Sequence, residues 1–192
     1  MTLMNKEAFK KGFQDMINKD IENAEALLNA LHEENMARRA GLRDRKRIVV
    51  KVGSSSLLHS TTKRLDYHKI DVLVRELSDL KNRGKDVILV SSGATAVGRE
   101  VIRRTGGGAN LAEDSPITVK QACAAIGQAR LMMTYQRFFT DYNQISAQVL
   151  MDKNTIENTL SKYNLYNTFN ELLKFDVIPI VNENDSVATY EY

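Results

Sequence analysis

Three groups of small and polar residues follow short β-branched runs, at positions where ligand-binding side chains often lie. They are residues 53–56 after RIVVKV, residues 91–94 after VILV and residues 182–185 after VIPIV. The carboxyl ends of parallel strands meet at one edge of a sheet, and ligands bind in the crevice outside that edge. We therefore expect the three groups, distant in the sequence, to form one site.

The first group has the chemistry of a phosphate-binding loop. Gly53 lets the backbone approach a ligand, and the amides from Ser54 onward can surround phosphate oxygens. Lys51 interrupts an apolar strand and can neutralise phosphate charge, although a lysine extending from a strand end is the alternative. The pattern differs from the common P-loop because the lysine precedes the glycine. An ordinary tight turn is the other interpretation of this segment.

The second and third groups could bind opposite charges. Ser92, Gly93 and Ala94 open a helix, whose unpaired N–H groups and positive dipole end suit a carboxylate or phosphate. Ser92 could add a hydroxyl donor or serve only as the N-cap. Asp185 suits an ammonium group or could cap a loop, and Asn182 stands nearby. Together these residues predict a site for a small zwitterion such as an amino acid, with a phosphate group beside it.

Other catalytic chemistries have little support in this sequence. His32, His59 and His68 show no metal-ligand spacing, so we predict no metal site built from protein side chains. Cys123 lies in an alanine-rich helical segment and is expected in the core rather than as a nucleophile. No segment resembles a nucleophile elbow or a dinucleotide-binding glycine fingerprint.

The elements that must position these groups begin near Arg47. From there, β-branched runs alternate with helical periodicity, which predicts an α/β fold with a mostly parallel sheet. Residues 1–45 form a second region, with apolar residues at helical spacing and then an arginine-rich linker. This helical arm could pack on its own domain or pair with another subunit. Because no aromatic residues interleave with its arginines, the linker is interpreted as a solvated hinge rather than a nucleic-acid patch.

Composition places the chain among globular proteins. It has 192 residues, 43% hydrophobic and 27% charged, and a net charge of +3, which is too small to indicate nucleic-acid binding. No apolar run approaches the roughly 20 residues of a membrane helix. The N-terminus lacks a secretory signal, and its acidic residues Glu7, Asp15 and Asp20 disfavour a transit peptide. With a single cysteine, we expect a cytoplasmic protein without membrane or nucleic-acid partners.

Four stretches together resemble the glutamate 5-kinases of the amino-acid kinase superfamily. They are RIVVKVGSSSL, VILVSSGATAVGRE, QACAAIGQARLM and VIPIVNENDSVAT. The same module forms the kinase half of bifunctional pyrroline-5-carboxylate synthases. The resemblance covers residues 46–192 and implies a three-layer sandwich. It also implies ATP-dependent phosphorylation of the γ-carboxylate of L-glutamate, with Mg²⁺, in proline biosynthesis.

The resemblance also implies roles for individual residues. Lys51 would be the catalytic, phosphate-facing lysine, with Gly53 and Ser54 as the nucleotide-side loop. The substrate-binding residues would be those of the second and third groups, namely Ser92, Gly93, Ala94, Asn182 and Asp185.

The sequence departs from the family pattern after the NEND block, because the nucleotide-binding half of such kinases is not present. We therefore expect the glutamate site without most of the ATP site, and little activity from this chain alone. The alternative is a non-catalytic glutamate- or proline-sensing protein, or an oligomerisation partner derived from the kinase. Because the last strand would lack neighbours from the missing half, an exposed sheet edge is expected there. A homo-oligomer or a partner chain supplying the missing half would follow.

Overall fold

The computed structural model describes residue 19 and residues 28–41, 43–106, 111 and 115–188. The chain divides into two compact units, Met1–Arg45 and Lys46–Tyr192. In the first unit, residues 28–41 are helical and all of their side chains are exposed. The helix predicted for the arm agrees with this part, and the earlier part of that prediction lies outside the described residues. The helix runs on through Gly41, into the segment that was interpreted as a hinge.

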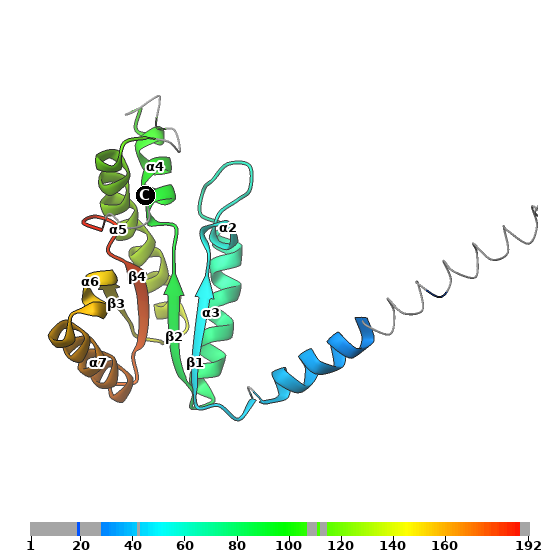
Figure 1. The fold of residues 1–192 in the computed structure, drawn as a ribbon. Coiled ribbons are helices and arrows are strands. Elements are labelled where there is room, and N and C mark those ends of the chain that lie inside the picture. The colour runs from blue at the N-terminus through cyan, green and yellow to red at the C-terminus, as the bar shows by residue number, and fades with distance from the viewer. Residues whose placement is uncertain (1–18, 20–27, 42, 107–110, 112–114, 189–192) are drawn as a thin grey trace, which may run out of the picture. The chain divides into compact units, whose positions relative to one another are not determined.

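Four parallel strands form the sheet of the second unit (Figure 1). They are β1 (Arg47–Val52), β2 (Asp86–Ser91), β3 (Ser146–Met151) and β4 (Ile178–Glu183). The strand order is β1-β2-β4-β3 and every neighbouring pair is parallel, which confirms the predicted sheet. The sequence suggested that the last strand would be an edge strand. This expectation was wrong, because β4 is paired on both sides. The edges are β1 and β3.

Helices connect the strands and cover the sheet. They are α2 (Ser54–Leu57), α3 (Tyr67–Asn82), α4 (Ala94–Arg104), α5 (Ile117–Asp141), α6 (Lys153–Glu157) and α7 (Thr159–Lys174). Side-chain caps define several starts: Asp66 accepts from the Lys69 amide at α3, and Asn158 accepts from the Ser161 amide at α7. These caps pair amides that a helix start otherwise leaves without partners.

The hydrophobic core lies between one face of the sheet and helices α3 and α5. In β2, Val87 and Leu89 are fully buried and alternate with partly buried neighbours, as expected for a strand with one well-covered face. Ile178 and Ile180 of β4 join the same core. The helices contribute a larger set: Ile70, Val74 and Leu77 from α3, and Leu131, Met132, Tyr135 and Phe139 from α5.

The opposite face of the sheet is covered only in part. Helix α7 contacts β4, which is buried at five of its six positions, so helices lie on both faces and form the expected three layers. In contrast, Val49 of β1 is 59% exposed and Lys51, two residues on, is also exposed. This side of β1 is therefore open, although parallel sheets usually have both faces covered.

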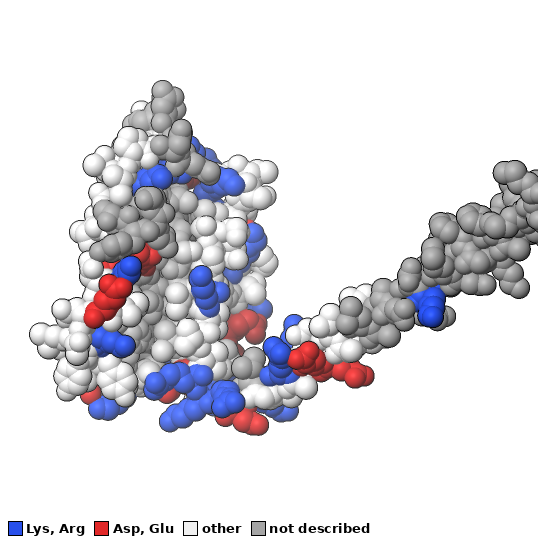
Figure 2. All heavy atoms as spheres, viewed as in Figure 1, with Lys and Arg blue, Asp and Glu red and all other residues white. Residues whose placement is uncertain are grey.

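Within the described part of the chain, no helix is long and apolar enough to cross a membrane. On the face of the Lys46–Tyr192 unit seen in Figure 2, Lys and Arg side chains are dispersed, with Asp and Glu among them.

Candidate functional site

The loops after β1 and β2 touch one another at the carboxyl edge of the sheet, where α2 and α4 begin (Figure 1). The Ser92 hydroxyl donates to the carbonyl of Val52 across 3.3 Å. A Cβ on Gly93 would lie 3.2 Å from the Cβ of Ser54. The structure therefore brings the first two predicted groups together.

Gly93 is the N-cap of α4 and has the left-handed backbone conformation, with φ of 100°. A residue with a side chain adopts this conformation at a cost, so the turn itself favours glycine. Ser92 is not the cap, which was one interpretation of its role, because its hydroxyl is turned toward β1. No side chain caps α4, so its first amides keep the capacity to bind an anion.

Helix α4 is held in place by an unusually close approach to α5. A Cβ on Gly127 would lie 1.8 Å from the carbonyl oxygen of Ala94, and one on Gly98 would lie 1.8 Å from that of Cys123. Only glycine permits this backbone contact at both positions. Cys123 is fully buried there, as expected for a core residue. The contact fixes the first turn of α4, and hence the candidate anion-binding amides, against the middle of α5.

A cavity of about 310 Å³ opens beside this helix pair. Its wall includes Ala94 from α4, Gln128 and small alanines from α5, Gln148 and Leu150 from β3, and Asp185 from the loop after β4. Ala94 at the start of α4 and the acidic residues Glu183 and Asp185 thus line one space. This arrangement offers a partial positive charge and a negative charge to the same small molecule.

Asn182 lies inside β4 rather than after it and pairs in register with Leu150. Asn182 is 4% exposed, and its Nδ2 donates to Oε1 of Gln128 across 2.6 Å. Asn182 therefore orients the amide of Gln128, which lines the cavity. The Nε2 of Gln128 is buried and has no hydrogen-bond partner among the described residues.

The loop that carries Asp185 is anchored by Asn184. The amide of Asn184 donates to the carbonyl of Met151 at the end of β3, and its own carbonyl accepts from the amides of Val187 and Ala188. The side chain of Asn184 also accepts from the Ser186 hydroxyl across 2.8 Å. Asp185 is partly buried within this turn. Its carboxylate is thus presented from a fixed loop at the end of two strands.

Under the site, the buried Tyr135 hydroxyl lies 3.0 Å from the Ser91 hydroxyl at the end of β2. Burial raises the pKa of Tyr135 to about 12, and the hydrogen bond with Ser91 offsets part of that rise. Tyr135 is therefore neutral at physiological pH and ties α5 to the strand that precedes Ser92.

Lys51 stands apart from these contacts. It pairs in register with Val90, while Ser91 pairs with Val52, so the side chains of Lys51 and Ser91 lie on opposite faces of the sheet. Lys51 is exposed on the open face of β1 and is not among the residues that line the 310 Å³ cavity. Gly53, just beyond it, has an ordinary φ of −83°, and a Cβ there would meet nothing closer than 4.0 Å.

The structure thus brings Ser54 close to Gly93 and places Ala94 and Asp185 on the wall of one cavity. Asn182 is linked to that wall through its hydrogen bond to Gln128. It does not join Lys51 to them. Sequence reasoning missed Gln128 and the glycines that seat α4 on α5. Their signal was the stretch CAAIGQA, in which small residues that allow close helix packing surround Gln128.

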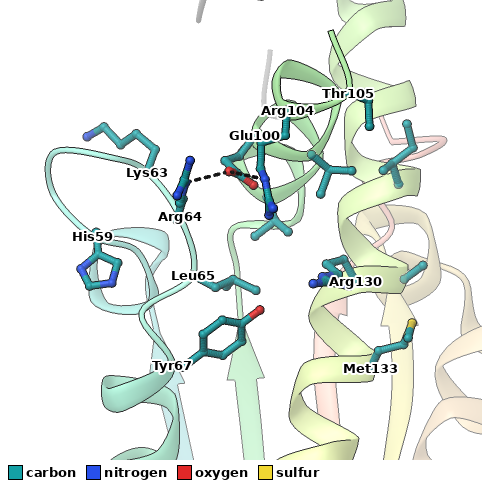
Figure 3. A pocket seen from close by; sticks show the side chains of 14 residues that line it. His59, Lys63, Arg64, Leu65, Tyr67, Glu100, Arg104, Thr105, Arg130 and Met133 are labelled. Atoms are coloured by element: carbon teal, nitrogen blue, oxygen red, sulfur yellow. Dashed lines mark ion pairs between the residues drawn. The ribbon is translucent and has the colours of Figure 1, made fainter. Parts of the chain in front are cut away.

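A second, larger cavity of about 760 Å³ lies between the segment before α3, helix α4 and helix α5 (Figure 3). Glu100 there lies between Arg64, at 3.2 Å, and Arg104, at 3.8 Å. Arg130 and Met133 of α5 form the opposite wall. None of the ligand-binding residues predicted from the sequence lines this cavity, so the 310 Å³ cavity is the candidate site.

The described residues contain no group of three or more His, Cys, Asp or Glu side chains arranged to hold a metal ion.

Comparison with known proteins gives a family model and glutamate 5-kinases as similar sequences. The sequence model of the amino acid kinase family matches residues 46–192. A glutamate 5-kinase of Enterococcus faecalis is 47% identical over 151 residues, which are 78% of this chain and 53% of the relative. Glutamate 5-kinases of Clostridium perfringens and Carboxydothermus hydrogenoformans are each 44% identical, over 80% and 78% of this chain and 54% and 39% of theirs. The chain thus spans about half the length, or less, of these relatives.

Proposed function

The chain belongs to the amino acid kinase family, and from this premise we propose that it carries the glutamate-binding part of a glutamate 5-kinase. Such an enzyme transfers the terminal phosphate of ATP to the γ-carboxylate of L-glutamate, giving γ-glutamyl phosphate for proline biosynthesis. Supporting the proposal, the relatives at 44–47% identity are glutamate 5-kinases. The chain would supply the amino-acid site and one loop toward the phosphates.

One observation supports the proposal most: Ala94, the first residue of α4, and Asp185 line the same cavity. An α-amino acid with an acidic side chain has an ammonium group at one end and a carboxylate at the other. Asp185 would hold the ammonium, and the amides of Gly93 and Ala94 would receive the γ-carboxylate. The Ser92 hydroxyl would join them by releasing the carbonyl of Val52. The charges of the ligand and of the cavity then match end to end.

The reaction asks for alignment and charge neutralisation more than for covalent catalysis. Lys51 would approach the transferred phosphate from the open side of β1, and the loop at Gly53 and Ser54 would leave room for its oxygens. Mg²⁺ would enter with the phosphates of ATP and supply additional charge neutralisation. The loop at Ser54 lies beside the start of α4, so the γ-carboxylate would be held on the phosphate side of the site.

Calorimetric titration with L-glutamate tests the substrate assignment directly. We expect binding by the unaltered chain and a weakening of about tenfold or more in Asp185→Ala, which loses a charge-assisted contact. The matched control is Asp141→Asn, which removes an exposed carboxylate at the end of α5 outside the cavity. If the unaltered chain does not bind glutamate, or Asp185→Ala binds as well, the assignment is wrong.

The catalytic part of the proposal has a separate test. The chain corresponds to about half of its relatives, so we expect little or no turnover in a hydroxamate assay with ATP, Mg²⁺ and glutamate. Robust turnover would show that the nucleotide site is complete within these residues. Glutamate or proline binding without turnover, even after a partner chain is added, would instead favour a sensing or assembly role.

We further propose that the protein is cytoplasmic, where ATP and glutamate are available, and that it works as a homo-oligomer or with a partner chain. The open side of β1, with Val49 exposed next to Lys51, supports the need for a covering partner.

A further inference from the structure

Gln128 presents an unusual amide to the candidate cavity. Its Oε1 accepts a short hydrogen bond, 2.6 Å long, from Nδ2 of Asn182. Its Nε2 is buried without a partner among the described residues, and the residue lines the cavity that Asp185 also lines. Buried donors are nearly always paired in folded proteins, so an unpaired one at a cavity wall indicates a group that a ligand satisfies.

The orientation of this amide is fixed by its surroundings. Asn182 is 4% exposed within β4, and Gly127 presses the backbone of α5 against Ala94. The carbonyl oxygen of the Gln128 amide is thereby directed at β4, so its NH₂ group is the part of this cavity-lining residue that has no protein partner among the described residues. An NH₂ group donates hydrogen bonds and cannot accept them. The partner must be an acceptor, and an anionic oxygen makes the strongest bond.

We propose that Nε2 of Gln128 donates to the α-carboxylate of the amino-acid substrate and so selects ligands that carry both an α-ammonium and an α-carboxylate. This inference rests on the proposed function, in which Asp185 holds the ammonium group. The ammonium and α-carboxylate are bonded to the same carbon, so a donor that shares the cavity with Asp185 is in place for that carboxylate. The γ-carboxylate, three carbons away, reaches the start of α4 instead.

The test compares two ligands that differ by one group. 4-Aminobutanoate is glutamate without its α-carboxylate, and the ratio of the two dissociation constants isolates that group. We expect the unaltered chain to prefer glutamate by about tenfold or more, the value of one hydrogen bond to a charged group. In Gln128→Glu this preference should largely vanish. The variant keeps an oxygen for Asn182 but replaces the donor with a repelling anion.

Gln128→Met provides a second variant, which removes the donor without adding charge. The matched control is Gln136→Met, the same substitution at an exposed position of α5 that lines neither of the two cavities. It should keep the full preference, and circular dichroism with thermal melting establishes which variants fold. An unchanged ratio in a folded Gln128 variant would overturn the inference. Failure of the unaltered chain to bind glutamate would overturn the proposed function and the inference with it.

Discussion

At the scale of single residues, two glycines at the carboxyl edge of the sheet differ in how much room and backbone freedom a side chain would have. Gly93 has a φ of 100°, and a Cβ there would lie 3.2 Å from that of Ser54, whereas Gly53 has an ordinary φ and open space around it. We expect Gly93→Ala to lower the free energy of unfolding by about 1–3 kcal/mol, because it combines backbone strain with a tight contact. The same change should weaken glutamate binding, because it shifts the α4 amides.

Gly53→Ala is the matched comparison for that prediction. We expect it to leave the free energy of unfolding within about 0.5 kcal/mol of the unaltered chain, as for changes that meet no packed neighbour. Urea denaturation of both variants checks the pair. Equal stability of the two alanine variants would contradict the role assigned to the Gly93 turn.

Tyr135 gives a prediction about alkaline pH. An unfolded tyrosine ionises near pH 10, whereas the folded pKa is raised to about 12, so the folded state holds its proton longer. Stability that is present below pH 10 is therefore lost as the pH rises toward 12. For this group alone the loss should reach about 2 kcal/mol at pH 12.

The variant Tyr135→Phe isolates that contribution. It should be less stable near neutral pH by about 1 kcal/mol, since the Ser91 hydroxyl loses its partner. Its unfolding free energy should then fall less steeply than that of the unaltered chain between pH 10 and pH 12. Tyr142, whose pKa is also raised, mainly by the hydrogen bond from its hydroxyl to Asp71, remains in both proteins and cancels from the comparison. Parallel curves for the two proteins would show that Tyr135 is not the group responsible.

At the scale of elements, the packing of α4 on α5 determines where the site lies. We expect Gly127→Ala to be destabilising by about 1–3 kcal/mol or more, because its methyl group would meet the Ala94 carbonyl oxygen at 1.8 Å. Glutamate affinity should fall together with stability, since the start of α4 and the Gln128 amide both move.

Gly41→Ala is the control for this prediction, because no heavy atom lies within 4 Å of the added Cβ and the residue is helical. It should be neutral or slightly stabilising. Thermal melting and glutamate titration of both variants provide the measurements. A Gly127→Ala protein that melts and binds like the unaltered chain would mean that the two helices can separate without cost.

The elements also show what the sequence could reveal. The alternation of β-branched runs with helical periodicity was enough for a parallel α/β sheet, because each signal is local. The strand order depends on contacts between distant segments, which local patterns do not reveal. The expectation of an exposed edge at β4 was wrong for that reason, because β3, although earlier in the sequence, pairs with the outer side of β4.

The site shows the same limit. Residues at strand ends, such as Ser92 and Asp185, could be predicted as candidates because parallel strands bring their ends together. Gln128 could not be found in this way, since it lies in the middle of a helix and becomes relevant only through the glycine contact with α4 and its bond to Asn182. Lys51 was predicted for its chemistry, and its place on the other face of the sheet followed only from the strand register.

At the scale of the whole molecule, the arm helix exposes apolar side chains that a lone helix in water does not favour. Leu28, Leu31 and Met36 are 65%, 47% and 52% exposed, and their spacing places them on one side of the helix. Isolated helices of this length are marginal without packing on an apolar side. We therefore predict that this apolar side is covered in solution, and the experiment below tests whether another subunit covers it.

Light scattering coupled to size-exclusion chromatography measures this pairing. Leu31→Glu should lower the average mass of the particles that the full chain forms in solution, because it places a charge within the apolar side of the helix. Ala37→Glu is the matched control: the position is on the other side of the same exposed helix, so the mass should not change. Deletion of residues 1–45 should lower the mass at least as much as Leu31→Glu. If Leu31→Glu and the deletion both keep the number of subunits of the unaltered protein, assembly depends on the Lys46–Tyr192 unit, with the exposed Val49 face of β1 as the next surface to alter.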